Sequence, residues 1–156
     1  AQSATNHPCE GGSLATRGRV ALFLRLHPPL YALKGFTVDD GRVMFADSVT
    51  EHMKKRRVTN EAMAEALDVS ARTISGWRNA QAPSLQLRDI TAICIRLHLE
   101  PELSDDLIAK AGLRPTCTEE HTVYRILLRT MYPYEPAECN EILIQAGFPP
   151  LFRASA

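Results

Sequence analysis

The sequence has no excess of either charge and no long hydrophobic run. Its 156 residues include 18 Lys and Arg against 18 Asp and Glu, so a whole-chain electrostatic argument for a nucleic-acid or membrane partner fails. The most hydrophobic N-terminal run, residues 20–24, is interrupted by Arg25 and by two prolines at 28–29. It is far shorter than the ~20 residues of a membrane span, and it lacks the core and cleavage site of a signal peptide. We expect no membrane association and a cytoplasmic location.

Metal-binding cysteine patterns are also absent. The four cysteines, Cys9, Cys94, Cys117 and Cys139, form no CxxC pair. Cys94 and His98 can share a helical face, but two ligands do not make a zinc site. We expect free thiols that pack as small apolar side chains, which suits a reducing compartment. We expect no metal and no other cofactor.

Enzyme signatures are missing as well. There is no HExxH, P-loop or GxSxG pattern. Glu119, Glu120 and His121 are consecutive on one expected helix, so they cannot all face one site. We expect no enzymatic activity and assign no catalytic residue.

The composition is that of a globular chain with an uneven charge distribution. Apolar residues make up 45% of the sequence, and the length suits either one domain or one domain plus an appendage. Residues 50–96 carry eight Lys and Arg against five Asp and Glu, whereas residues 97–156 carry five against nine. This asymmetry directs attention to the basic middle of the chain.

The patterns predict a mostly α chain with one short hairpin. Residues 1–35 give no firm periodic signal, and because the chain begins with Ala we expect part of residues 1–18 to have been added to the natural protein. Residues 36–45 place apolar residues on both sides of an Asp-Gly turn, which predicts a β-hairpin. Helices are expected at about 47–57, 60–67, 71–79, 83–97, 101–112, 118–131 and 136–146.

Residues 60–79 have the pattern of a short helix, a sharp turn and an outward-facing second helix. Ala64 leaves room where the helices cross, and Leu67 and Val69 fill the angle between them. Ser70 can cap the second helix. Ile74 and Trp77 are three residues apart and point inward, which leaves the outer face to Arg72, Thr73, Ser75, Gly76 and Asn79.

This pattern resembles the Xre/Cro-type helix-turn-helix family of phage and bacterial repressors. The resemblance covers about residues 47–112 and rests on Ala64, Asp68, Val69-Ser70, Thr73-Ile74-Ser75, Trp77, Pro83-Ser84-Leu85 and Ile90. It implies a five-helix repressor-like DNA-binding domain at 47–114, preceded by a segment, 1–46, that holds the hairpin. Residues 115–156 look like a two-helix extension found on some Firmicutes-type members.

Three positions depart from the family pattern. Asp68 stands where Gly is usual, although Asp accepts a left-handed conformation. Asn60 replaces the commoner Gln. Gly76 lies inside the expected recognition helix, where it costs about 1 kcal/mol relative to Ala. It either permits close approach to DNA or loosens the helix.

The resemblance implies a sequence-specific regulator, a repressor by analogy, that reads the major groove of double-stranded DNA with the helix at 71–79. Base contacts are expected from Arg72 first, and then from Ala71, Ser75 and Gly76. Phosphate contacts are expected from Asn60, Ser70, Thr73, Asn79, Lys54, Lys55 and Arg57. The basic run at 54–57 has an alternative interpretation as a solvated helix end whose cations offset the helix dipole.

Relatives usually bind as pairs on half-sites ~34–36 Å apart, so we expect a homodimer. The dimer contact is expected from the hairpin or from the C-terminal helices, which could also bind a protein partner. The C-terminal apolar residues could equally be ordinary core: Tyr124, Ile126, Leu127, Leu128, Met131, Tyr132 and Tyr134. The alternative function is a protein-interaction adaptor or antitoxin-like partner in which the helix-turn-helix is secondary.

Overall fold

The computed structural model describes residues 38–154 apart from 82–84, with side chains described from Val43 onward. Residues 37–156 group into one compact unit. The predictions made for residues 1–37, Cys9 among them, lie outside the described part of the chain. Among the described helices, none is long and apolar enough to cross a membrane.

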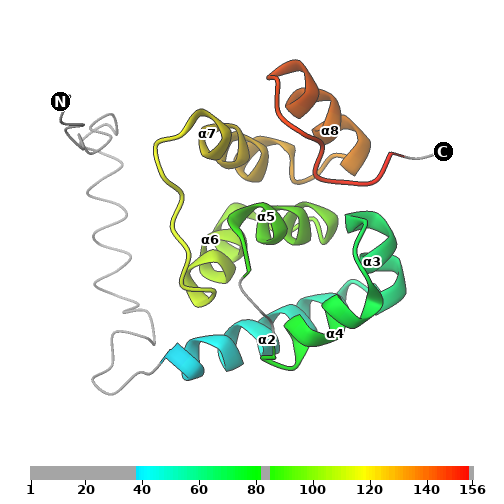
Figure 1. The fold of residues 1–156 in the computed structure, drawn as a ribbon, viewed down its shortest axis with the longest axis vertical. Helices are drawn as coiled ribbons and strands as arrows, with labels where there is room; N and C mark the ends of the chain where they lie inside the picture. Colours follow the sequence, from blue (N-terminus) through cyan, green and yellow to red (C-terminus); the bar gives the residue numbers. More distant parts are fainter. Residues whose placement is uncertain (1–37, 82–84, 155–156) are drawn as a thin grey trace, which may run out of the picture. The chain divides into compact units, whose positions relative to one another are not determined.

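The described part of the chain is mostly α and contains no strand, which confirms the predicted class. Short connections join the helices in chain order (Figure 1). They are α2 (Val38–Lys55), α3 (Asn60–Leu67), α4 (Ala71–Arg78), α5 (Leu87–Arg96), α6 (Pro101–Lys110), α7 (Glu119–Ile126), the π-helical turn η2 (Leu127–Met131) and α8 (Pro136–Gln145).

The predicted hairpin is wrong in the part that the structure describes. Val38–Phe45 forms the first turns of α2, a helix of 18 residues, where we expected a strand and a turn. Phe45, Val49 and Met53 recur every four residues, and each is no more than 2% exposed. Burial at this helical spacing outweighs the Asp-Gly turn signal, since tertiary packing routinely overrides local preference.

These helices are capped by residues that lie close by in the chain. Thr59 Oγ1 accepts from the Ala62 amide at 3.2 Å and starts α3, and Thr118 Oγ1 accepts from the His121 amide at 3.2 Å and starts α7. Gly112 and Gly147 follow α6 and α8 with φ of 70° and 82°. These left-handed positions favour glycine after a helix end.

Besides the start of α2, at Val38 where about 47 was expected, two further helices differ from the predictions. α5 starts at Leu87 rather than near 83, because Gln86 and Asp89 form a capping box in which the Gln86 amide donates to Asp89 Oδ2 at 3.0 Å. The helix expected at 118–131 becomes π-helical at Leu127. There the Thr130 hydroxyl donates to the Ile126 carbonyl at 2.8 Å and competes for a backbone acceptor.

One hydrophobic core joins all these helices. α5 contributes buried residues on most of its circumference and packs against α3, α6 and η2. The C-terminal helices share this core through Tyr124, Leu127, Leu128 and Leu143. Of the residues considered for a dimer contact, Tyr124, Leu127 and Leu128 are therefore core, whereas Ile126 and Tyr134 are exposed by 51% and 48%.

The prediction of free thiols is confirmed for Cys94 and Cys139 and is wrong for Cys117, which is not a free thiol. Burial raises the pKa of Cys94 to about 12 and that of Cys139 to about 11, since an apolar site disfavours the thiolate.

His98, which could share a helical face with Cys94, is bonded elsewhere. Its Nδ1 lies 2.8 Å from the Tyr132 carbonyl oxygen, so this ring nitrogen is hydrogen-bonded to the backbone.

Candidate nucleic-acid interface

α3 and α4 are joined by a tight turn centred on Asp68. Asp68 has φ of 55°, a left-handed conformation that Asp adopts more readily than most residues. The Val69 amide donates to the Ala64 carbonyl at 3.0 Å and closes the end of α3. Ala64 itself is only 5% exposed, which fits a small side chain placed where two helices approach closely.

Ser70 caps α4, as its position in the sequence predicted. Its Oγ accepts from the Thr73 amide at 3.1 Å. The same oxygen lies 2.8 Å from Thr73 Oγ1, so the two hydroxyl groups bond to each other. The cap therefore fixes both side chains at the exposed start of α4.

The two faces of α4 differ as the sequence pattern predicts. Ile74 is fully buried and Trp77 is 5% exposed, both on the face that packs against α2 and α3. Ala71 and Arg72 are exposed at the start of the helix, and Asn79 is exposed just after its end.

Ser75 and Gly76 are half-buried on the middle of α4. The Ser75 Oγ accepts from Asn79 Nδ2 at 3.2 Å. A Cβ built on Gly76 would meet no atom within 4 Å, so packing inside the protein does not require glycine here. The space around Gly76 therefore does not decide whether this glycine permits close approach to DNA or loosens the helix.

Arg78 fixes α4 to its neighbours, a role that sequence reasoning missed. Its Nε donates to Thr50 Oγ1 of α2 at 3.2 Å, and its Nη1 donates to Asn60 Oδ1 of α3. One guanidinium group therefore ties together the three helices of the candidate interface. These partners are 28 and 18 residues away, and no local pattern reports such contacts.

Asn60 is thus only partly available for the phosphate contact that we expected. It is half-buried, and its amide oxygen is occupied by Arg78. A phosphate needs a donor, and the amide nitrogen of Asn60 is the group that could supply one. The structure places Asn60 at the start of α3, where backbone N–H groups are also without helical partners.

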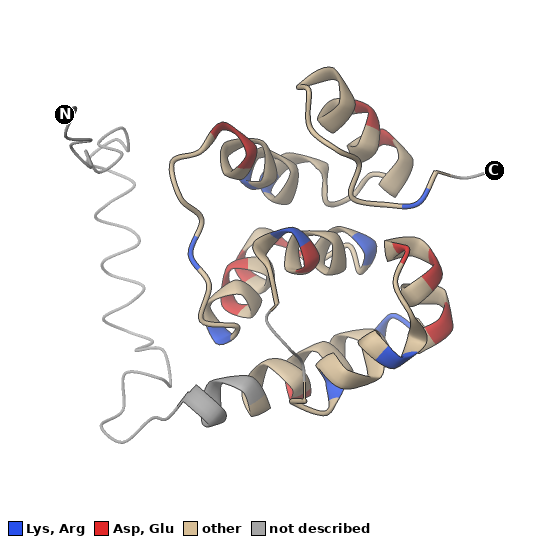
Figure 2. Cartoon of the chain, in the orientation of Figure 1, with Lys and Arg blue, Asp and Glu red and all other residues tan. Residues whose placement is uncertain are grey.

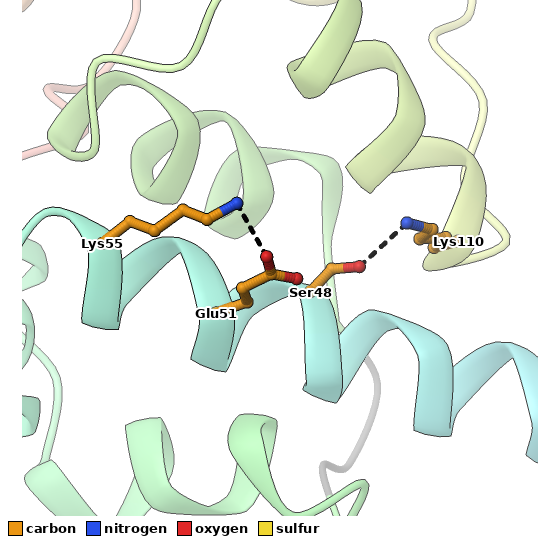
Figure 3. Close-up of polar contacts among 4 residues, drawn as sticks. All are labelled: Ser48, Glu51, Lys55 and Lys110. Carbon is orange, nitrogen blue, oxygen red and sulfur yellow. Dashed lines mark hydrogen bonds and ion pairs between the residues drawn. The ribbon is translucent and has the colours of Figure 1, made fainter.

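The basic residues at the end of α2 divide into engaged and unengaged side chains. Lys55 Nζ pairs with Glu51 at 2.7 Å, one turn earlier on the same helix (Figure 3). Arg56 Nη2 donates to the His98 carbonyl at 3.2 Å. The side chains of Lys54 and Arg57 are exposed, and among the ion pairs of the described residues neither takes part.

Lys110 of α6 holds the middle of α2 in place. Its Nζ donates to Ser48 Oγ at 2.9 Å and pairs with Asp106 at 2.6 Å. Figure 3 shows Lys110 reaching α2 on one side of Glu51 while Lys55 approaches from the other. The hydrogen bond from Lys55, followed by its charge, lowers the pKa of Glu51. Glu51 therefore offsets part of the positive charge at this end of α2.

The charges around α4 are mixed. Arg72 and Arg78 are the charged residues of α4, whereas α3 carries Glu61 and Glu65, both exposed (Figure 2). Asp68, at the turn, is exposed too. The exposed charge is therefore positive at Arg72, on the first turn of α4, and at the end of α2, and negative on the outer face of α3.

The described residues offer no metal-binding cluster beside this interface. They contain no group of three or more His, Cys, Asp or Glu side chains that could hold a metal ion.

Comparisons with known proteins give no relative. No protein-family model, no curated protein and no solved structure matches the chain.

Proposed function

We propose that the protein is a sequence-specific regulator that binds double-stranded DNA and inserts α4 into the major groove. α3, the turn at Asp68 and α4 would form the helix-turn-helix, with Arg72 as the first base-contacting residue. The proposal includes the resemblance to Xre/Cro-type repressors and a homodimer that binds paired half-sites.

The observation that carries the proposal is the division of α4 into two faces. Ile74 and Trp77 anchor the helix from below, while Arg72 stands exposed on its first turn. The helix also begins at a sharp turn, so its first residues are the most accessible part. An exposed helix with an arginine near its N-terminus suits a groove about 12 Å wide and the paired acceptors of guanine.

The bonds that each residue already makes in the structure rank the residues proposed to contact phosphates. Lys54 and Arg57 are the strongest candidates, since both are exposed and outside the ion pairs of the described residues. Lys55 would have to leave Glu51 first. Ser70, Thr73 and Asn79 hydrogen-bond within α4 and its cap, and would contact phosphates through their remaining bonding capacity.

A protein-interaction adaptor remains the second candidate. The exposed face of α3 is acidic, and the C-terminal helices expose Ile126 and Ile144 by 51% and 59%. Both features suit a protein partner better than DNA, because acidic side chains repel phosphates and exposed aliphatic groups gain from burial in an interface.

The test is selection of bound fragments from random DNA duplexes, followed by affinity measurements on the enriched sequence. We expect one enriched motif, and we expect Arg72→Ala to lose about 1–3 kcal/mol and to relax the preference at one base pair. Arg114→Ala is the matched control, since Arg114 is an exposed arginine in the loop after α6. Absence of any enriched motif, together with a stable complex with another protein, would favour the adaptor.

A further inference from the structure

The last described residues of the chain run back from α8 to α3. After Gly147 ends α8, Leu151 and Phe152 enter the core with only 3% and 4% of their surface exposed. In Figure 1 this segment is the red stretch that leaves α8 and passes beside α3. We call residues 150–153 the C-terminal strap.

Asn140 of α8 binds the backbone of the strap through both of its polar atoms. Its Oδ1 accepts from the amides of Leu151 and Phe152, each at 3.0 Å, and its Nδ2 donates to the Phe152 carbonyl at 2.9 Å. Asn140 is one of few buried polar side chains in the described part of the chain. Three bonds to one short stretch of backbone fix its path, since each would be costly to leave unmade in a buried site.

Two further bonds tie the strap to the helices next to α4. Arg88 of α5 donates from Nη2 to the Pro150 carbonyl at 2.6 Å. The Arg153 amide donates to the Ala66 carbonyl at 2.9 Å.

Ala66 belongs to the last turn of α3, where carbonyl groups have no partner within the helix. The Ala64 and Glu65 carbonyls are satisfied locally by the amides of Val69 and Asp68. The Ala66 carbonyl receives its bond from a residue 87 positions later in the chain. The strap therefore completes the end of α3 immediately before the turn that leads into α4.

We propose that the strap sets the orientation of α4, and that Asn140 is the positioning residue that holds the strap in place. The two C-terminal helices thereby act on the α3–α4 pair without contacting what α4 binds. The part of this inference that concerns DNA affinity rests on the proposed function. The part that concerns the α3–α4 turn stands independently of it.

The most selective test removes a single hydrogen bond. Arg153→Pro deletes the amide that donates to Ala66, whereas Arg153→Ala removes the side chain and keeps the amide. Amide hydrogen exchange is then measured at Asp68 and Val69. We expect exchange about fivefold faster in Arg153→Pro, the change expected for loss of one net backbone hydrogen bond, and no change in Arg153→Ala.

A second pair of variants addresses Asn140 directly. Asn140→Ala is compared with Leu143→Ala, a buried neighbour on α8 that makes none of the strap bonds. Trp77 is the single tryptophan of the chain, so quenching of its emission by acrylamide reports on α4 alone. Asn140→Ala is expected to raise Trp77 quenching below the unfolding transition, and Leu143→Ala to leave it unchanged there.

The outcomes separate the two proposals. Equal exchange at Asp68 and Val69 in wild type and Arg153→Pro would overturn the strap proposal, whatever the DNA measurements show. Faster exchange in a protein for which no DNA motif is enriched would support the strap and contradict the regulator. If both proposals are right, Arg153→Pro also weakens binding to the enriched duplex about fivefold, by the same hydrogen-bond argument.

Discussion

At the scale of single residues, the candidate interface depends on side chains that never touch its outer surface. Ile74 and Trp77 anchor α4 from below, and Arg78 ties its end to Thr50 and Asn60. These contacts leave Arg72 free at the opposite, exposed side. The burial of Trp77 therefore determines whether α4 can present Arg72 at all.

Replacing Trp77 by Ala is expected to lower the free energy of unfolding by about 3–5 kcal/mol, because a large buried ring leaves a cavity. Urea denaturation followed by circular dichroism measures this, since the variant has no tryptophan to follow. Tyr134→Ala, at a side chain 48% exposed, is the control and should cost less than about 0.5 kcal/mol. Equal effects of the two substitutions would mean that α4 is oriented differently.

The stability of the folded protein is expected to depend on pH through His52. Burial, followed by the charge of Lys55, lowers the pKa of His52 below its ordinary value. A depressed pKa in the folded state means that the contribution of His52 to stability is complete above about pH 6.5, the unfolded value, and is lost as the pH falls through the folded pKa. His52→Gln should flatten the melting temperature against pH in that window. An unchanged slope would exclude this role.

The residues that the sequence predicted correctly are those whose partners lie close by in the chain. Ser70 caps α4 through Thr73, three residues away, and Ile74 and Trp77 follow helical spacing. The Arg78–Asn60 contact depends on how three helices meet, and periodicity carries no such information. The sequence therefore predicted a phosphate contact for Asn60 without showing that its amide oxygen already accepts a hydrogen bond from Arg78.

At the scale of elements, long-range contacts hold the C-terminal end of α4 and the last turn of α3. The guanidinium of Arg78 connects it to α2 and α3, and the strap completes the end of α3 at Ala66. Lys110 in turn connects α2 to α6 through Ser48. The orientation of α4 is thus a property of the surrounding helices, and the motif at 60–79 does not determine it alone.

Arg78→Ala tests that view of α4. The substitution removes donors from two half-buried acceptors, on Thr50 and Asn60, so we expect a loss of about 1–3 kcal/mol in unfolding free energy. Hydrogen exchange should accelerate in α4 more than in α6. Arg78→Lys keeps the charge and can reach one acceptor at a time, so it should recover part of the loss. No difference between Ala and Lys would contradict the bridging role.

The error over the hairpin also belongs to this scale. Asp-Gly between apolar residues is a turn signal in isolation, but the same residues continue a helix when Phe45, Val49 and Met53 are all buried on one side. Residues 38–45 are helical because α2 packs into a core whose residues lie far apart in the sequence. The strap escaped prediction for the same reason, since its partners lie on α3, α5 and α8.

At the scale of the whole molecule, one core connects the α3–α4 pair with the C-terminal helices. Ile74 and Trp77 belong to the same buried cluster as Tyr124, Leu143 and Phe152. A chain with one shared core is expected to unfold cooperatively. The C-terminal helices therefore contribute to the stability of α4 even if they bind no partner.

Leu143→Ala tests whether the described part of the chain unfolds as one cooperative unit. Leu143 is fully buried on α8, so the substitution should cost about 2–5 kcal/mol. Trp77 fluorescence and far-ultraviolet circular dichroism should then lose their signals at the same, lower urea concentration. Two separated transitions, with the Trp77 transition unmoved, would show that residues 115–156 fold on their own.

The most direct test of the central claim, that α4 reads bases while the end of α2 contacts phosphates, is the salt dependence of DNA affinity. Dissociation constants would be measured over a salt series for an enriched duplex and a scrambled one. For Lys54→Ala/Arg57→Ala, we predict a slope of log K against log salt that is shallower by about 1.8, at ~0.9 per phosphate contact, with an unchanged preference for the enriched duplex. Arg72→Ala should instead reduce that preference about 5- to 150-fold, which corresponds to the expected loss of about 1–3 kcal/mol. If Arg72→Ala leaves the preference between the two duplexes intact, α4 does not read the bases and the account is wrong.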